Sequence, residues 1–192
     1  MAAFAFLGIL TLVQAPLAHS APWSVSISGA GGQQINCYRP TSRLGLEIAA
    51  SRVISEGVGL GLELGAWEEI GARGFSYASF GPTGPDREHD RDAAMSALVR
   101  LGKRVGHARP HVLLGVGEYL TAHRQTSRDE NTWTSPEYSP GFSVGVGISR
   151  SSMPTPVVAV RWHHVYTPSV SPHGVPQRTT DRLLVSAGVS FD

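Results

Sequence analysis

The chain ends in DRLLVSAGVSFD (residues 181–192), a stretch with one continuous apolar face. Apolar side chains occupy every second position from Leu183 to Phe191, and small or polar residues occupy most of the positions between them. Successive side chains of a β-strand point to opposite faces of the sheet. The stretch therefore predicts a strand with an apolar environment on one side and a more polar one on the other. The same alternation recurs along the chain, so this segment decides the fold.

Seven further segments upstream show the same period of two, which brings the predicted strands to eight. These seven segments are residues 23–29, 43–53, 58–67, 94–104, 111–121, 141–149 and 157–166. In segment 111–121 the pattern is ambiguous, because Glu118 shares its face with Val112 and Val116. Either Glu118 points inward with these valines, or a β-bulge shifts the register.

The connections between the predicted strands alternate in length. Three are short (residues 54–57, 105–109 and 150–155), and four are long and polar (residues 30–42, 68–93, 122–140 and 167–180). Short periplasmic turns and long external loops are typical of outer-membrane barrels, in which tilted strands of about 10 residues cross the bilayer. We expect an all-β protein, an eight-stranded antiparallel up-and-down transmembrane β-barrel. Its last strand should pair with residues 23–29, because an open sheet edge is not tolerated in lipid.

The first 20 residues resemble an export signal. An uncharged apolar run is followed by small residues at Ala18 and Ser20, just before Ala21. Such a run is too short to span a membrane and predicts a secretory signal peptide over residues 1–20. Residues 21–192 then form the barrel domain, located in the outer membrane of a Gram-negative cell.

Composition excludes several classes of protein. The sequence has 16 Lys and Arg against 15 Asp and Glu, so a nucleic-acid partner is not indicated. Its single cysteine, Cys37, excludes an intramolecular disulfide framework. The 22 glycines suit short strands and tight turns.

The charged residues within the predicted strands lie mainly on the small-residue face, which should line the lumen. They are Glu47, Glu63, Arg100, Arg161 and Arg182. The interior of an eight-stranded barrel is just filled by side chains. We therefore expect an ion-pair network that closes the lumen, with Arg182 directed toward Glu47 or Glu63 and with Glu118 and His163 as further members. The alternative is a hydrated polar lining without specific pairs.

Aromatic residues gather near the predicted strand ends, where interfacial girdles form. They are Trp23, Trp67, Tyr119, Tyr138, Phe142, Trp162, Tyr166 and Phe191. Trp67 shares its face with the small and charged positions of its segment, so its side chain should point inward, which disagrees with a place in the girdle.

The histidines show no metal-ligand spacing, and we expect no metal, cofactor or catalytic site. His89, His123 and His173 fall in three predicted external loops, and His163 and His164 stand near the outer end of a strand.

The eight amphipathic strands, the export signal and the ending LLVSAGVSF (residues 183–191) resemble the small outer-membrane β-barrel families, such as the OmpA-like transmembrane domain. The resemblance implies a porin-like fold, contact with outer-membrane lipid and lipopolysaccharide, and insertion by the barrel assembly machinery. We expect a monomer with a structural, adhesive or ligand-binding role through its external loops, and not an enzyme.

Two alternatives stay open. One small-barrel family, the lipid A deacylases, carries a His and a Ser two residues apart near the outer end of a late strand. Here His164 has the corresponding place, but Tyr166 stands where the Ser would be, and the nearest serine is Ser169. The second alternative is a soluble, periplasmic lipocalin-like carrier, whose apolar face would point inward.

Overall fold

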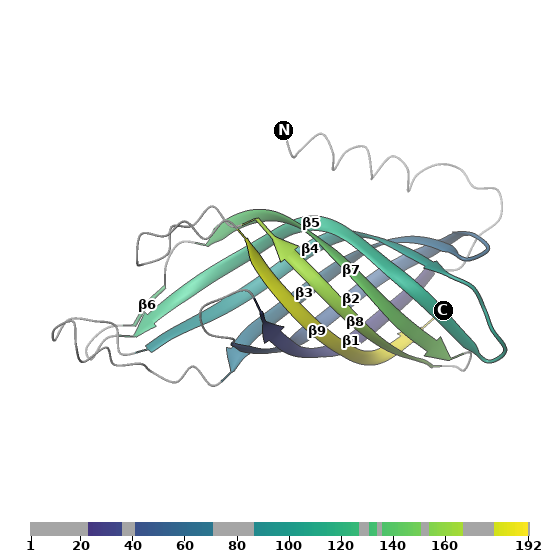
Figure 1. Cartoon of the computed structure of the whole chain (residues 1–192), viewed down its shortest axis with the longest axis horizontal. Coiled ribbons are helices and arrows are strands. Elements are labelled where there is room, and N and C mark those ends of the chain that lie inside the picture. Colours follow the sequence, from purple (N-terminus) through teal and green to yellow (C-terminus); the bar gives the residue numbers. More distant parts are fainter. Residues whose placement is uncertain are drawn as a thin grey trace.

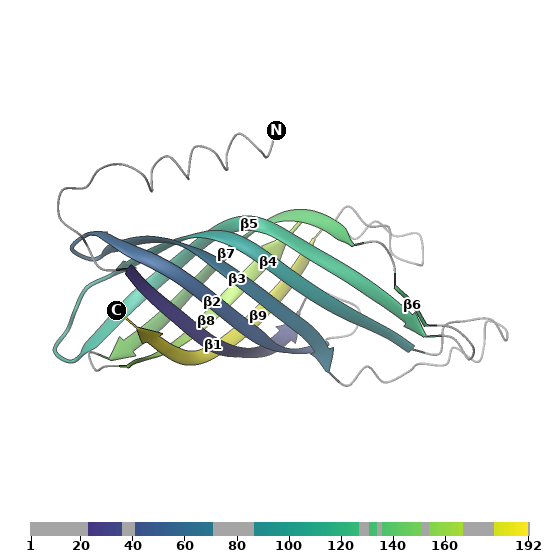
Figure 2. The same cartoon turned by 180° about the vertical axis from the view of Figure 1, so that it is seen from behind.

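The computed structural model describes residues 23–35, 41–70, 87–126, 131–133, 136–150, 154–166 and 179–191. Eight antiparallel strands form a closed barrel (Figures 1 and 2). They are β1 (Trp23–Gln34), β2 (Ser42–Ser55), β3 (Val58–Ile70), β4 (Arg87–Gly102), β5 (Ala108–Thr126), β7 (Glu137–Arg150), β8 (Thr155–Val165) and β9 (Thr180–Phe191). A short strand, β6 (Asn131–Trp133), pairs only with the far end of β5. The predicted signal peptide lies outside the described residues.

The first and last strands close the barrel, as the sequence predicted. Strand β1 pairs with β2 on one side and with β9 on the other, so that Ile27 lies opposite both Ile48 and Val189. Each of the eight wall strands is therefore paired on both sides. Closure satisfies the backbone hydrogen-bonding groups that an open sheet would leave exposed in lipid.

The apolar faces point outward. Leu46, Val116 and Val146 are among the most exposed residues, with relative exposures of 62%, 60% and 62%. Glycine, serine and charged residues alternate with them and point into the barrel. This arrangement is that of a transmembrane barrel, whose outer surface contacts lipid. The lipocalin-like alternative is wrong, because it requires the opposite placement of the two faces. Within the described residues, no helix has the length and apolar character needed to cross a bilayer.

The short turns define one end of the barrel. Gly57 and Gly106 take positive φ angles of 84° and 61° in the β2–β3 and β4–β5 turns, a conformation that favours glycine. Trp23 and Phe191, the first and last described residues, lie at the same end (Figure 1). We call it the periplasmic end, because short turns face the periplasm in barrels of this type. Strands β4 and β5 extend farthest toward the other end, the outer end.

The structure corrects several sequence predictions. Strand β4 begins at Arg87, and β5 ends at Thr126, so His89 and His123 lie in paired strands and not in loops. Strand β5 runs without a bulge, and Glu118 points outward together with Val116. Both proposals for Glu118 were therefore wrong. This residue lies toward the outer end of β5, where a carboxylate on the outward face can reach the polar headgroup region. Cys37 and His173 lie outside the described residues.

The aromatic residues divide between two locations. Tyr138, Tyr166, Trp23 and Phe191 are exposed on the outward face near the strand ends, as expected of a girdle. Tyr119 is fully buried, and Trp67 is 3% exposed. The girdle prediction is wrong for both residues, because both occupy inward-facing positions of their strands and their rings fill the lumen.

Candidate functional site

Small inward residues provide room for the large side chains of the lumen. A Cβ atom on Gly65 would overlap the indole of Trp67, and one on Gly145 would overlap the Arg161 side chain. These glycines therefore let an eight-stranded barrel hold tryptophan and arginine side chains that otherwise would not fit.

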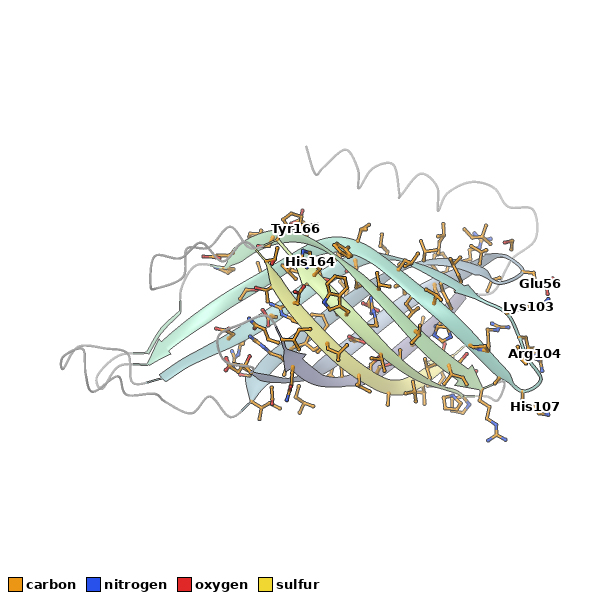
Figure 3. All side chains as sticks on the ribbon, in the orientation of Figure 1. Glu56, Lys103, Arg104, His107, His164 and Tyr166 are labelled. Carbon is orange, nitrogen blue, oxygen red and sulfur yellow. The ribbon has the colours of Figure 1, made fainter. Side chains whose placement is uncertain are left out.

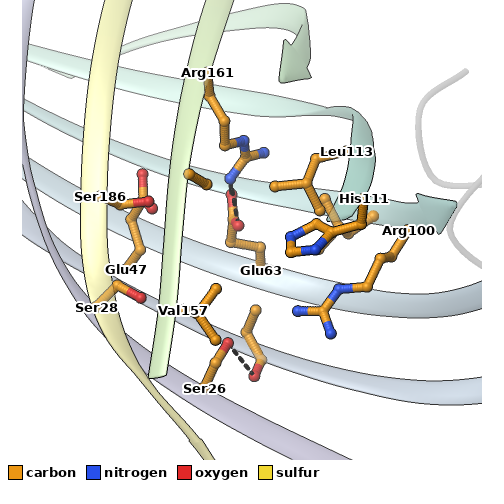
Figure 4. A pocket seen from close by; sticks show the side chains of 13 residues that line it. Ser26, Ser28, Glu47, Glu63, Arg100, His111, Leu113, Val157, Arg161 and Ser186 are labelled. Carbon is orange, nitrogen blue, oxygen red and sulfur yellow. Dashed lines mark hydrogen bonds and ion pairs between the residues drawn. The ribbon is translucent and has the colours of Figure 1, made fainter. Parts of the chain in front are cut away.

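The periplasmic half of the lumen contains a buried ion pair between Arg161 of β8 and Glu63 of β3 (Figure 4). Three strands separate β3 from β8 in either direction around the barrel, so the pair spans the lumen. Arg161 also donates a hydrogen bond of 2.8 Å to Ser143 Oγ. Both charges are almost fully enclosed, with side-chain exposures of 2% and 8%. In such surroundings each charge requires the other, because an unpaired buried charge costs several kcal/mol.

Glu47 and Arg100 lie next to this ion pair. Together with His111 and Ser186 they line a cavity of about 40 Å³, which has room for only a few water molecules (Figure 4). Glu47 lies close enough to Glu63 and Arg161 to interact with both charges. The structure thus brings Glu47, Glu63, Arg100 and Arg161 around one small space.

A second network fills the outer half of the lumen, and Asp92 of β4 is its centre. Its Oδ2 atom accepts a hydrogen bond of 2.7 Å from Arg43, and its Oδ1 atom accepts bonds of 2.8 Å from Arg182 and Thr121. Arg43 also donates to Asp90 and Gln34. Strands β4 and β9, which carry Asp92 and Arg182, are again separated by three strands in either direction.

Arg182 was expected to meet Glu47 or Glu63, and this expectation is wrong. Arg182 stands near the start of β9, at the outer end, whereas both glutamates lie deeper in the barrel. Sequence reasoning missed Arg43 and Asp92 as members of the lumen. The alternation of the sequence could have identified both residues. Arg43 is an even number of positions from the inward Glu47, and Asp92 is an even number of positions from the inward Ser96 and Leu98.

A buried aromatic layer lies between the two networks. The Tyr119 hydroxyl and His163 Nδ1 are hydrogen-bonded at 2.8 Å. The Trp67 and Tyr119 rings each meet the His163 ring edge to face, with centroid distances of 5.6 and 5.9 Å. Ala30, Ala94, Val165 and Leu184 complete this cluster. Ion pairs and aromatic rings therefore follow one another along the barrel axis.

A separate polar pair lies on the outward face near the outer end. His164 Nδ1 is 2.5 Å from Asp181 Oδ1, and both side chains are partly exposed. Three aromatic residues lie close to the imidazole, with ring centroids between 4.8 and 5.4 Å from it: Phe142, Trp162 and Tyr166. Figure 3 labels His164 and Tyr166 at this end of the barrel. This pair faces the lipid boundary. Among the described residues, no group of three His, Cys, Asp or Glu side chains is arranged to hold a metal ion.

Comparisons with known proteins agree with this architecture. No protein-family model matches the sequence, and no curated protein matches it. Among solved structures, Neisserial surface protein A is similar with a TM-score of 0.60 at 14% identity, over 88% of this chain and 95% of that one.

Two further structures show the same fold. A major outer-membrane protein from Thermus thermophilus has a TM-score of 0.53 at 14% identity, over 88% of this chain and 100% of that one. The outer-membrane protein OprG from Pseudomonas aeruginosa has a TM-score of 0.51 at 14% identity, over 90% and 97% of the two chains. The chain therefore has the fold of the small outer-membrane β-barrels, as the sequence predicted.

Proposed function

We propose that this outer-membrane barrel is a closed, non-conducting and non-enzymatic scaffold that presents binding surfaces at its outer end. The observation that carries the proposal is the filling of the lumen by two ion-pair networks with an aromatic layer between them. An open channel would need a barrel of more strands, because the lumen of an eight-stranded barrel has space for little more than side chains.

The ion pairs also support a structural role. Arg161–Glu63 and Arg182–Asp92 each join strands on opposite sides of the barrel, so they resist flattening of its cross-section. A rigid wall holds the outer extensions of β4 and β5. Binding residues often lie on loops held by such a rigid scaffold. We propose a monomer, inserted by the barrel assembly machinery, with outer-membrane lipid and lipopolysaccharide around it.

A binding assay with loop variants tests this role. The connection at residues 71–86 or 167–178 is replaced by a short Gly-Ser turn, and cells that display each barrel are tested for attachment to a panel of matrix proteins and host cells. We expect attachment by the complete barrel and its loss in at least one variant that still shows the heat-dependent gel shift of a folded barrel. Equal attachment by cells with and without the complete barrel would contradict the proposal.

One observation favours a second candidate function, an ester hydrolase that acts at the membrane surface. His164 and Asp181 form a pair on the lipid-facing side, the arrangement in which a carboxylate orients a general base. His164 would take a proton from a water molecule that attacks an acyl ester, and would then pass it to the leaving alcohol. The place of the serine nucleophile expected in a lipid A deacylase is occupied by Tyr166, which is why this candidate comes second.

Mass spectrometry of lipid A separates the two candidates. The barrel and its His164→Ala variant are produced in a Gram-negative host, and the lipid A from each culture is compared. A hydrolase would remove an acyl chain only in cells with the unmodified barrel. Identical lipid A in both cultures is the result that the non-enzymatic proposal expects.

A further inference from the structure

The two ends of the barrel carry opposite net charge among the residues whose side chains the structure describes. Among the described residues at the periplasmic end, five are cationic and one is acidic: Arg52, Lys103, Arg104, Arg109, Arg150 and Glu56. Among the outer-end residues whose side chains the structure describes, seven are carboxylates and three are arginines: Glu68, Glu69, Asp90, Asp92, Glu118, Glu137, Asp181, Arg43, Arg91 and Arg182. Figure 3 labels Lys103, Arg104 and His107 at the periplasmic turns. The described part of the periplasmic end therefore carries a net positive charge.

The cations occupy defined positions at the edge of the apolar band. On β4 the outward row of Met95, Ala97, Val99 and Leu101 is followed two residues later by Lys103. On β7 the outward row of Val144, Val146 and Ile148 is followed by Arg150. Positions two apart on a strand lie about 7 Å from one another on the same face. Arg150, the last residue of β7, thus stands one step beyond the last lipid-facing side chain of that strand, and Lys103 directly follows the last residue of β4 at the same end.

Neighbouring residues reinforce the charge. Arg109 of β5 is exposed opposite the inward-facing Ser149 of β7, so its charge lies at the mouth of the lumen, on the opposite face of the wall from Arg150. Arg52, also on an outward row, lies opposite Trp23, an aromatic residue of the membrane boundary. Lys103, Arg104, Arg109 and Arg150 are all exposed. Their charges are therefore accessible to a ligand.

We propose that Lys103 and Arg150, two exposed cations that follow the outward rows on either side of β5, bind the phosphate groups of anionic phospholipids in the periplasmic leaflet. Lysine and arginine beside a membrane surface each contribute to the attraction of acidic lipids. The adjoining apolar rows fit the acyl chains of the same molecule, so the site should prefer a lipid to a free anion. This inference concerns the periplasmic rim and is independent of the proposed role of the outer end.

Native mass spectrometry of the folded full-length barrel in detergent tests the site. Bound lipid is measured with phosphatidylglycerol, with phosphatidylcholine, and with phosphatidylglycerol in the presence of excess inorganic phosphate. We expect phosphatidylglycerol to bind more tightly than phosphatidylcholine and to remain bound when inorganic phosphate is added. The Lys103→Gln/Arg150→Gln double variant should bind phosphatidylglycerol more weakly, by about fivefold for each cation removed.

Two matched variants accompany this measurement. Arg91→Gln removes an exposed cation at the outer end and should leave binding unchanged. Lys103→Arg/Arg150→Lys keeps both charges and should retain binding, which separates loss of charge from a failure to fold. Equal binding of the two lipids, unchanged binding by the double glutamine variant, or displacement by inorganic phosphate would each overturn the proposal.

Discussion

Arg161 on β8 and Glu63 on β3 form a buried ion pair across the full width of the lumen, joining strands that lie opposite one another in the barrel. Arg182 and Asp92 repeat this relationship nearer the outer end, between β9 and β4. Neighbouring strands are already held together by backbone hydrogen bonds. The two ion pairs add connections that the backbone cannot make, and they occupy the space that a pore would need.

Loss of Arg161 should destabilise the barrel strongly. The Arg161→Met variant leaves the Glu63 carboxylate buried without its partner, and we expect the free energy of unfolding to fall by about 3–5 kcal/mol. Denaturant unfolding in detergent micelles, followed by tryptophan fluorescence, measures the change. Arg91→Gln is the control, because Arg91 pairs with Glu68 on the surface and should contribute no more than about 1 kcal/mol. Equal stability of the two variants would refute the importance of the buried pair.

Asp92 should contribute more to stability than either arginine that it binds. The Asp92→Asn variant keeps the shape of the side chain but removes the charge that compensates Arg43 and Arg182. We expect a loss of about 3–5 kcal/mol, larger than the loss in Arg182→Met, which leaves Arg43 bound to Asp92. The same unfolding measurement compares the two. An Asp92→Asn variant as stable as the unmodified protein would show that the outer network contributes nothing.

Two glycines on opposite faces should differ in their tolerance of a methyl group. In Gly65→Ala the new Cβ would overlap the Trp67 ring, and we expect a cost of about 1–3 kcal/mol from overpacking. Gly29 points outward, and the nearest atom to a Cβ there is 4.0 Å away, so Gly29→Ala should change stability little. Parallel unfolding curves of the two variants test this difference, and coincident curves would argue against a tightly filled lumen.

A charge on the outward face should reveal where the bilayer lies. Val146 is 62% exposed within the apolar outward row of β7, and Val146→Arg should cost about 2–4 kcal/mol if this position is near the bilayer midplane. Tyr138 is on the same face at the outer end, where the same substitution should cost about 0–1 kcal/mol. Refolding into lipid vesicles measures both. A larger cost at Tyr138 than at Val146 would contradict the assigned membrane position.

The sequence was sufficient to predict the wall of the barrel. Alternating residues define which side chains face lipid, and this requires no knowledge of the partner strand. The pairing of β1 with β9 followed because a barrel in lipid must close. The same reasoning failed at Glu118, because a carboxylate on the lipid-facing side was treated as excluded along the whole strand, although it is tolerated near the membrane boundary.

The partners inside the lumen could not be predicted from parity alone. The alternation of residues along β9 places Arg182 in the lumen. Which side chains lie at the same depth depends on the stagger between neighbouring strands, and no local pattern in the sequence encodes that stagger. Asp92 was missed for a different reason. The predicted strand began at residue 94, and the extension of β4 to Arg87 passes through EHDRD (residues 88–92), a run of charges that is typical of a loop.

Electrical recording across a planar lipid bilayer tests the central claim most directly, because ions pass only if a continuous aqueous path exists. With the folded barrel inserted, we expect no sustained conductance above that of the lipid alone, since two ion-pair networks and the Trp67–Tyr119–His163 layer fill the lumen. Insertion is verified on the same sample by the heat-dependent gel shift. Stable conductance steps from the folded protein would contradict a closed lumen, and with it the proposal of a non-conducting scaffold.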